Sequence, residues 1–312
     1  MKVGIMGCGA YGISLAVNLV KCNDITMWTA LEDEKNEIIS TRYNDKMLKG
    51  IYIDEKINVT TSIEEVMNND VVIIVVPVKF IENTLSKMKN YVTNQTFVIA
   101  SKGIVNGHLL NEYVEKYLNT DKIGVISGGT FAIDLANFSE SGLTICGSNE
   151  IRDILRNMIN LDHIKLDESS DIKGVELVAS IKNTMAILMG ILNKLDVTIT
   201  TNCRVLTDIL NDINKIIISL GGESDTILKY AGIGDTYLTC TSNKSRNFTF
   251  GELLVEDKEK AYEFLENNTV EGVNTLKEIT KILENNNTQI DSIIKLNEII
   301  NNDENPKIIL KK

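Results

Sequence analysis

The chain has 312 residues, 43% of them hydrophobic, and a formal net charge of −11 at pH 7. This length is sufficient for two domains, each with its own core. The negative charge argues against nucleic acid and against anionic membrane surfaces as partners. No apolar stretch approaches the roughly 20 residues that a membrane span needs, and no signal-peptide pattern opens the chain. We therefore expect a cytoplasmic protein with no membrane insertion.

The cysteines and histidines give no indication of a metal site. The five cysteines are odd in number and scattered, and no two of them form a C-x-x-C pair. This distribution argues against a disulfide scaffold and against a recognisable zinc site. His108 and His163 are far apart in the sequence. We expect each of them at the surface or at a helix end, with no metal bound.

The first predicted strand, Val3–Met6, runs directly into three glycines with the spacing G-x-G-x-x-G. An amphipathic stretch over residues 11–21 follows. This order of strand, glycine turn and helix is the context that a dinucleotide-binding fingerprint needs. Gly7 would form the tight turn, Gly9 would let backbone amides approach a pyrophosphate, and Gly12 would let the helix pack closely on the strand.

A second strand is predicted over residues 25–28, followed by Thr29 and Ala30. In a dinucleotide-binding unit, an acidic residue at this strand end binds the adenine ribose, and an arginine nearby accommodates the 2′-phosphate of NADP. Glu32 and Asp33 come slightly late for the first role, and no arginine is in place for the second. The sequence therefore leaves the choice between NAD and NADP open.

The remaining elements of the first half alternate between strands and helices. Val71–Val76 is a continuous β-branched apolar run, typical of a parallel strand buried on both faces, and Pro77 ends it. Further strands are predicted at 96–100, 122–126 and 143–146, and helices at 62–69, 80–88 and 109–118. The alternation indicates a doubly wound, Rossmann-like α/β domain whose last strand is 143–146.

From about Asp171 the pattern changes to helices, without a clear strand signal. Residues 174–192 keep apolar side chains at helical spacing. Later helices are predicted at 204–220, 224–230, 258–266, 272–284 and 289–301. We therefore expect a dinucleotide-binding domain over 1–170 and an all-α substrate and catalytic domain over 171–312.

One segment is unusually polar for the helix that contains it. Lys182, Asn183 and Thr184 interrupt an otherwise apolar stretch. A lysine is costly to bury unless it has a use, and a partly desolvated lysine is suited to proton transfer to a carbonyl oxygen. A lysine that extends to the surface along its aliphatic stem is the alternative.

A second polar segment covers residues 232–247. It combines the carboxylate of Asp235 and several hydroxyls with the pair Arg246-Asn247 at a predicted helix start. The planar guanidinium of an arginine suits a phosphate, and the amides of a helix N-terminus add to the attraction. The alternative is a capping loop with a solvated arginine. Lys102 follows a predicted strand at the sheet edge where α/β folds place ligands, although a solvent lysine in a turn would fit equally well.

Taken together, these residues resemble the NAD(P)-dependent glycerol-3-phosphate dehydrogenases of the bacterial type, over nearly the full chain. The matching stretches of the first half are 7–12, 75–77, 101–104 and 127–132. Those of the second half are 174–176, 182–183, 232–235, 238–242, 245–247 and 270–272. The run L-T-C-T-S-x-x-S-R-N is highly specific, and so is its position after Lys182.

The resemblance implies reversible NAD(P)H-dependent reduction of dihydroxyacetone phosphate to sn-glycerol 3-phosphate, feeding glycerophospholipid synthesis. It implies that Lys182 is the proton donor and acceptor, that Asp235 orients Lys182 or the substrate hydroxyl, and that Lys102 binds substrate and approaches the nicotinamide. The other implied substrate-binding residues are Gly128, Thr130, Asn183, Thr239, Ser245, Arg246 and Asn247. The implied cofactor contacts are Gly7, Gly9, Ala10, Tyr11, Gly12, Lys102, Ala132, Arg246 and Glu271.

Several departures from the family pattern keep alternatives open. Ser127-Gly128-Gly129 stands where the family usually has Ser-Gly-Pro, residues 196–201 replace a glycine-rich turn, and the segment after Arg204 is atypical. One alternative is a divergent relative that reduces another small phosphorylated ketone. Another is a nucleotide-binding sensor without turnover, which would have no need of a proton donor. A 3-hydroxyacid or 6-phosphogluconate dehydrogenase would share the architecture but would not need the Ser-Arg-Asn run. A homodimer and product inhibition stay open.

Overall fold

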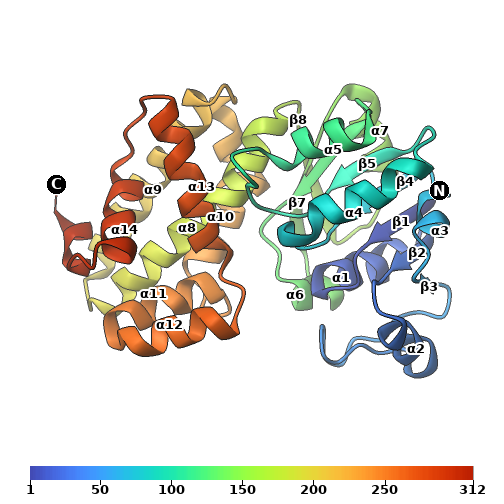
Figure 1. The fold of residues 1–312 in the computed structure, drawn as a ribbon, viewed down its shortest axis with the longest axis horizontal. Helices are drawn as coiled ribbons and strands as arrows, with labels where there is room; N and C mark the ends of the chain where they lie inside the picture. The colour runs from blue at the N-terminus through green and yellow to red at the C-terminus, as the bar shows by residue number, and fades with distance from the viewer. Residues whose placement is uncertain (312) are drawn as a thin grey trace. The chain divides into compact units, whose positions relative to one another are not determined.

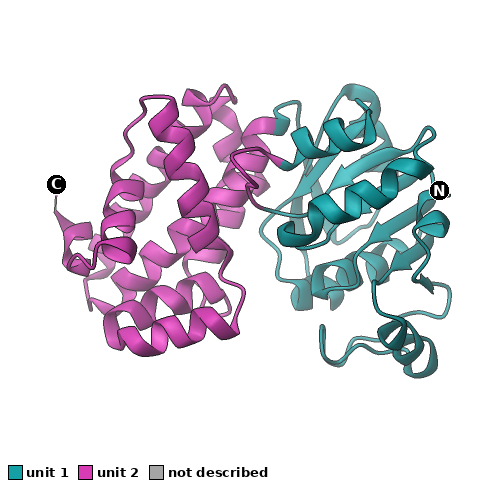
Figure 2. Cartoon of the chain, in the orientation of Figure 1, with its two compact units in different colours: residues 1–102, 110–172 teal, residues 103–109, 173–312 magenta. Residues whose placement is uncertain are grey.

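The computed structural model describes residues 1–311, which form two compact units (Figures 1 and 2). Unit 1 consists of residues 1–102 and 110–172. Unit 2 consists of residues 103–109 together with the chain from residue 173 onward. The short segment 103–109 thus packs with the helical unit, where the backbone amide of Gly107 donates to a carboxylate oxygen of Glu278 at 2.7 Å.

Unit 1 is built on an eight-stranded sheet with the order β3-β2-β1-β4-β5-β6-β7-β8. The strands are β1 (Lys2–Met6), β2 (Asp24–Trp28), β3 (Asn58–Thr60), β4 (Val71–Ile74), β5 (Thr96–Ile99), β6 (Ile123–Ser127), β7 (Ser141–Cys146) and β8 (Ile164–Ser169). All neighbouring pairs are parallel except β6 and β7. The predicted doubly wound α/β fold is confirmed.

Helices cover both faces of the sheet, as continuous apolar strands such as β4 require. On one face α1 (Ala10–Leu19) packs against α6 (Ala132–Ala136), and their apolar side chains share one core with those of α7 (Asn149–Met158). Elsewhere α4 (Ile81–Met88) packs against both α3 (Ile63–Met67) and α5 (Leu110–Leu118). The remaining helical elements of the unit are α2 (Glu32–Thr41) and the short 3₁₀ turns Val78–Phe80 and Lys89–Tyr91.

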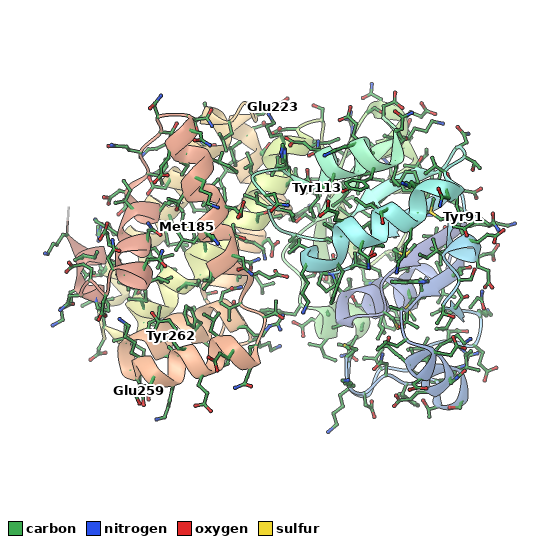
Figure 3. All side chains as sticks on the ribbon, in the orientation of Figure 1. Tyr91, Tyr113, Met185, Glu223, Glu259 and Tyr262 are labelled. Carbon is green, nitrogen blue, oxygen red and sulfur yellow. The ribbon has the colours of Figure 1, made fainter. Side chains whose placement is uncertain are left out.

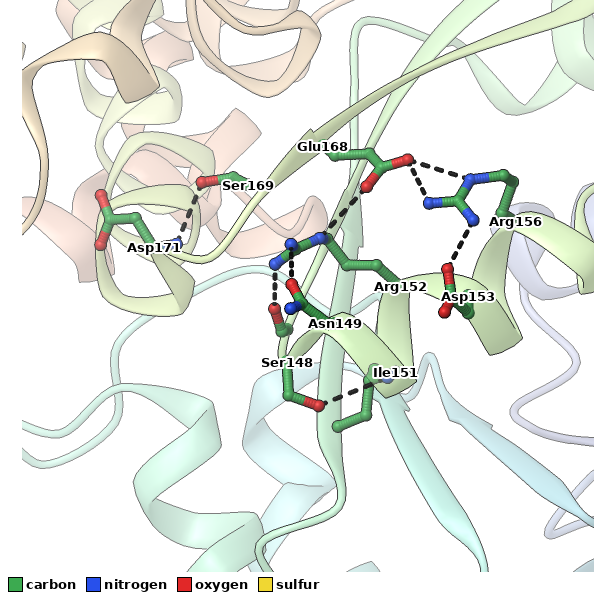
Figure 4. A network of polar contacts seen from close by, with 10 residues as sticks. Ser148, Asn149, Ile151, Arg152, Asp153, Arg156, Glu168, Ser169 and Asp171 are labelled. Carbon is green, nitrogen blue, oxygen red and sulfur yellow. Dashed lines mark hydrogen bonds and ion pairs between the residues drawn. The ribbon is translucent and has the colours of Figure 1, made fainter.

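The prediction that 143–146 is the last strand is wrong, because β8 follows it. This strand lies at the sheet edge, and its charged Lys165, Asp167 and Glu168 hide the short apolar signal. Glu168 is held by two arginines of α7: Arg152 Nε donates to it at 3.1 Å and Arg156 Nη2 at 2.6 Å (Figure 4). One of the charges that make the segment look like a loop in the sequence, that of Glu168, is therefore paired in the fold.

The sheet reverses its strand order at β1. Met6, the last residue of β1, pairs with Trp28 of β2 on one side and with Ile74 of β4 on the other. The chain builds β2 and β3 outward from β1 and then returns to place β4 on the opposite side. Such a reversal opens a crevice at the carboxyl ends of the strands, where α/β folds bind ligands. Gly7 is the first residue beyond that edge.

Unit 2 is helical, as predicted. Its helices are α8 (Ile172–Lys194), α9 (Ile199–Ser219), α10 (Asp235–Cys240), α11 (Arg246–Glu256), α12 (Lys258–Asn267), α13 (Glu271–Asn285) and α14 (Asp291–Asn301). Shorter turns are the 3₁₀ segments Ser224–Leu228 and Pro306–Leu310 and the π-helical segment Tyr230–Gly234.

The central helix α8 corrects one expectation from the sequence. It has 23 residues and is apolar enough to cross a membrane by length and composition, although no such stretch was expected. Every residue from Gly174 to Leu192 is buried by the rest of the fold, including Met185, labelled in Figure 3. The apolar character of α8 therefore belongs to the core of unit 2.

Candidate active site

The glycine loop of unit 1 has the geometry of an anion cradle. Gly7 has φ +138°, which favours glycine, and a Cβ on Gly12 would lie 2.1 Å from the carbonyl oxygen of Gly7. A Cβ on Gly9 would meet nothing within 4 Å, so this side of the loop is open. Gly9 is also the N-cap of α1, with no side-chain cap and no acidic residue in the first turn. The amides at the start of α1, at Ala10 and Tyr11, are therefore suited to a pyrophosphate.

A second group of unit 1 residues lies at the end of β6. Gly128 packs tightly, since a Cβ there would lie 2.4 Å from the carbonyl oxygen of Gly142. The hydroxyls of Ser127 and Thr130 are buried and have no hydrogen-bond partner within residues 1–311. Buried hydroxyls are normally paired, so these two are suited to a bound ligand. Ala132, the first residue of α6, follows directly.

Lys102 lies in the turn after β5 and is half-buried. The preceding residue fixes this turn, because Ser101 Oγ donates to the carbonyl oxygen of Val76 at 2.6 Å. The turn is therefore tied to the end of β4, the strand beside β1.

In unit 2, Lys182 of α8 forms a buried ion pair with Asp235 of α10. Lys182 Nζ lies 2.6 Å from Asp235 Oδ1 and donates to Thr239 Oγ1 at 2.7 Å. The side chains of Lys182 and Asp235 are only 6% and 2% exposed. The interpretation of Lys182 as a surface lysine is therefore wrong. A charged pair this deep is costly to desolvate, which favours a functional reason for it.

Local structure places Asp235 against α8. The π-helical segment Tyr230–Gly234 leads directly into α10, and such segments are frequent at functional sites. Thr239 lies one turn after Asp235 and donates its hydroxyl to the carbonyl oxygen of Asp235 at 2.7 Å. Cys240 is buried beside this pair, and burial raises the pKa of its thiol to about 12. Cys240 is therefore a neutral thiol at physiological pH.

The start of α11 has features that suit a second anion. Ser245 is its N-cap and accepts a hydrogen bond from the backbone amide of Phe248. The first helical residue, Arg246, is exposed and forms no hydrogen bond or ion pair with the part of the chain that the structure describes. The helix N-terminus and the guanidinium together are suited to a phosphate.

Two glycines fix α11 against the helix that carries Lys182. A Cβ on Gly190 of α8 would lie 2.0 Å from the carbonyl oxygen of Phe248, and a Cβ on Gly251 of α11 would lie 2.0 Å from that of Ile187. The two backbones therefore touch directly, which positions the start of α11 relative to α8.

A polar network joins α8, α11 and α13. Asn183 Nδ2 donates to Glu271 Oε2 at 3.2 Å, and Asn247 Nδ2 donates to Asn183 Oδ1 at 3.2 Å. Asn247 Oδ1 in turn accepts from the amide of Gly272 at 2.9 Å. Thr184, which the sequence marks as polar but to which no site role was assigned, donates its hydroxyl to the carbonyl oxygen of Gly272 at 2.9 Å. Its polarity within an apolar helix was the available signal.

The geometry can be compared with known proteins. The sequence profile of the NAD-dependent glycerol-3-phosphate dehydrogenase N-terminus matches residues 2–153, and that of the C-terminus matches residues 171–311. The chain belongs to the NAD-dependent glycerol-3-phosphate dehydrogenase family.

Individual relatives agree with this assignment. A glycerol-3-phosphate dehydrogenase [NAD(P)+] of Thermoanaerobacter sp. is 32% identical over 286 residues, which cover 89% of this chain and 86% of the relative. One from Alcanivorax borkumensis is 30% identical, with 88% and 82% covered. The fold is similar to the crystal structure of glycerol-3-phosphate dehydrogenase from Coxiella burnetii, with a TM-score of 0.91, 24% identity, and 100% and 99% of the two chains covered.

Proposed function

We propose that the chain catalyses the reversible reduction of dihydroxyacetone phosphate to sn-glycerol 3-phosphate, with sn-glycerol 3-phosphate supplied to glycerophospholipid synthesis in the cytoplasm. The chain is an oxidoreductase of its family, and its cofactor is NAD or NADP. The observation that carries the proposal is the buried pair of Lys182 and Asp235, with Thr239 as a further partner. A cofactor-binding sensor would not need this costly arrangement.

Reduction of a ketone adds a hydride to carbon and a proton to oxygen. The bound nicotinamide supplies the hydride. In our proposal Lys182 donates the proton from its ammonium to the developing alkoxide and becomes a neutral amine. In the reverse direction the amine takes the proton from the hydroxyl. Asp235 and Thr239 hold Nζ in place for both directions, because each accepts a hydrogen bond from it.

The phosphate of the substrate would bind at the start of α11. Arg246 supplies an exposed guanidinium that is unpaired within residues 1–311, and Ser245 and Asn247 flank it in the sequence. We assign Lys102, Gly128, Thr130 and Asn183 to the substrate as well, on the resemblance described above.

The pyrophosphate of the cofactor would bind to the glycine loop and the start of α1. We further assign Ala132, Lys102, Arg246 and Glu271 to the cofactor. Residues 1–170 then form the dinucleotide-binding domain and 171–312 the domain that carries the proton donor and the phosphate site.

The test is the loss of absorbance of NADH and, in parallel, of NADPH when purified protein is mixed with dihydroxyacetone phosphate. We expect rapid oxidation that depends on the ketone, and sn-glycerol 3-phosphate as the product. Oxidation of cofactor only with a different phosphorylated ketone would replace the substrate assignment. Cofactor binding without turnover of any such ketone would contradict the proposed enzyme and favour a sensor.

A further inference from the structure

A carboxylate is fixed at the end of β2, although no acidic residue follows that strand directly in the sequence. Glu34 lies in the first turn of α2, and its side chain reaches back to Thr29, the residue after β2. The hydroxyl of Thr29 donates to Glu34 Oε2, and Asn44 Nδ2 donates to Glu34 Oε1 at 2.8 Å. Thr29 and Asn44 are each only 3% exposed. Two rigid partners therefore hold the carboxylate of Glu34 in one place.

This place adjoins the glycine loop. Met6 and Trp28 are paired in the sheet, so Cys8 and Thr29 leave neighbouring strands at the same edge. Asn44 Nδ2, which binds Glu34, also lies 4.0 Å from the sulfur of Cys8. The charge of Glu34 contributes, after burial, to raising the pKa of the Cys8 thiol to about 12. The carboxylate therefore acts electrostatically on the loop that we assign to the pyrophosphate.

Two basic side chains of α2 and its C-terminal end, Lys35 and Arg42, are engaged elsewhere. Lys35 pairs with Glu32, and the guanidinium of Arg42 donates to the backbone oxygens of Ile57 and Glu55, both at 3.4 Å. The first turn of α2 holds Glu32, Asp33 and Glu34. The first turn of α2, which follows β2, is thus acidic.

We propose that Glu34 binds the ribose of the cofactor's adenosine half and makes this chain selective for NAD over NADP. The inference rests on the cofactor site of the proposed function and not on its ketone substrate. Each oxygen of Glu34 accepts one hydrogen bond from the protein and keeps a free lone pair for a ribose hydroxyl. A 2′-phosphate at the same position would place two negative groups side by side, while Lys35 and Arg42 are engaged with other groups.

Direct binding tests this inference without any turnover. The wild-type chain is titrated with NADH and NADPH, followed by nicotinamide fluorescence, and with 5′-ADP and 2′,5′-ADP, followed by calorimetry. We expect Kd for NADPH to exceed that for NADH by about 100-fold, or about 2.7 kcal/mol, with the same order for the two ADP probes. Equal Kd values, or tighter binding of NADPH, would overturn the inference. Neither result depends on dihydroxyacetone phosphate, so failure of the proposed reaction is recognised separately.

Substitutions then test whether Glu34 causes the preference for NADH over NADPH. Glu34→Gln removes the charge and keeps the size, and we expect the ratio of the two Kd values to fall by about tenfold, mainly through tighter NADPH binding. Glu37→Gln removes a charge from an exposed position one turn further along α2 and should leave the ratio unchanged. An unchanged ratio in a folded Glu34→Gln protein would overturn the assignment.

A second variant covers the case in which Glu34→Gln does not fold. Thr29→Val keeps the shape of the side chain but removes the hydroxyl that holds Glu34. The freed carboxylate should bind the ribose less well, so we expect weaker NADH binding and a ratio at least about threefold smaller. A ratio equal to that of the wild type would contradict the role of the Thr29–Glu34 contact.

Discussion

The ammonium of Lys182 lies 2.6 Å from a carboxylate oxygen of Asp235, and the two residues are 53 positions apart in the chain. Both side chains are almost completely buried. The pair joins the central helix α8 to the short helix α10. It therefore contributes to the packing of unit 2 and to the chemistry that we propose, and substitutions should separate the two contributions.

Replacing Lys182 by alanine should abolish most turnover without changing cofactor binding. A positioned general acid contributes roughly 10²- to 10⁴-fold, so we expect kcat to fall by that factor while Kd for NADH stays within about twofold. The measurement is steady-state reduction of dihydroxyacetone phosphate beside a fluorescence titration. Lys194→Ala is the matched control, because Lys194 is a partly exposed lysine at the end of the same helix. Retention of more than about a tenth of the activity would rule out this role.

Replacing Asp235 by alanine should destabilise the fold as well as reduce activity. Removing one partner of a buried ion pair leaves an uncompensated charge and costs about 3–5 kcal/mol. We expect this loss in the free energy of unfolding, measured in urea. Asp235→Asn should be milder, since its amide oxygen can still accept a hydrogen bond from Lys182. Equal stability of the alanine variant and the wild type would show that the pair is not needed for packing.

Replacing Arg246 by alanine should chiefly raise KM for the phosphorylated ketone. Loss of a charged hydrogen bond to phosphate is worth about 1.5–3 kcal/mol, which corresponds to roughly 10- to 150-fold in KM. The stability should hardly change, because the side chain is exposed and unpaired in residues 1–311. Lys258→Ala, on the surface of α12, removes a positive charge elsewhere and should leave KM as it is. An unaltered KM in Arg246→Ala would remove Arg246 from the phosphate site.

Replacing Gly251 by alanine should separate α11 from α8. The new methyl would lie 2.0 Å from the carbonyl oxygen of Ile187, and overpacking typically costs about 1–3 kcal/mol or more. We expect a lower Tm and a raised KM for the ketone, because α11 carries Ser245 and Arg246. Gly234→Ala is the control for stability, since a Cβ there would meet nothing within 4 Å. A Tm for Gly251→Ala equal to that of this control would contradict the close packing.

Unit 1 should lose stability in acid, because protonation of the Glu168 carboxylate weakens its contacts. Its hydrogen bond with Arg156 is the main cause that lowers the pKa of Glu168 from its ordinary value of 4.5. A carboxyl with a lowered folded pKa stabilises the fold fully above its unfolded pKa and loses that contribution as pH falls through the folded value. Because Glu168 is partly exposed, the contribution is at most about 1 kcal/mol. Glu168→Gln should therefore lower Tm at pH 7 and have a smaller effect at pH 3. An equal effect at both values would contradict this account.

The sequence determined the parts of the protein that depend on neighbours in the chain. Strands appear in the sequence as short apolar runs, such as the one before Gly7 and Val71–Val76. The spacing of the three glycines marks positions whose backbone conformation or close packing favours glycine. They were sufficient to predict the doubly wound unit and its glycine loop. The same holds for Lys182, whose charge stands out within a helix that is otherwise apolar. The family resemblance added the pairing of Lys182 with Asp235.

The tertiary structure decided what depends on residues brought together from distant positions. The edge strand β8 was missed because it carries charged residues, and the partners of one of them, Glu168, are two arginines of α7 that only the fold brings to it. The role of Glu34 was missed because its carboxylate reaches the end of β2 from the first turn of the next helix, held by Thr29 and Asn44. Such contacts join separate segments of the chain, so no repeating pattern of residues in a single sequence indicates them. Their energy comes from burial and hydrogen bonding between segments that only the complete fold places side by side.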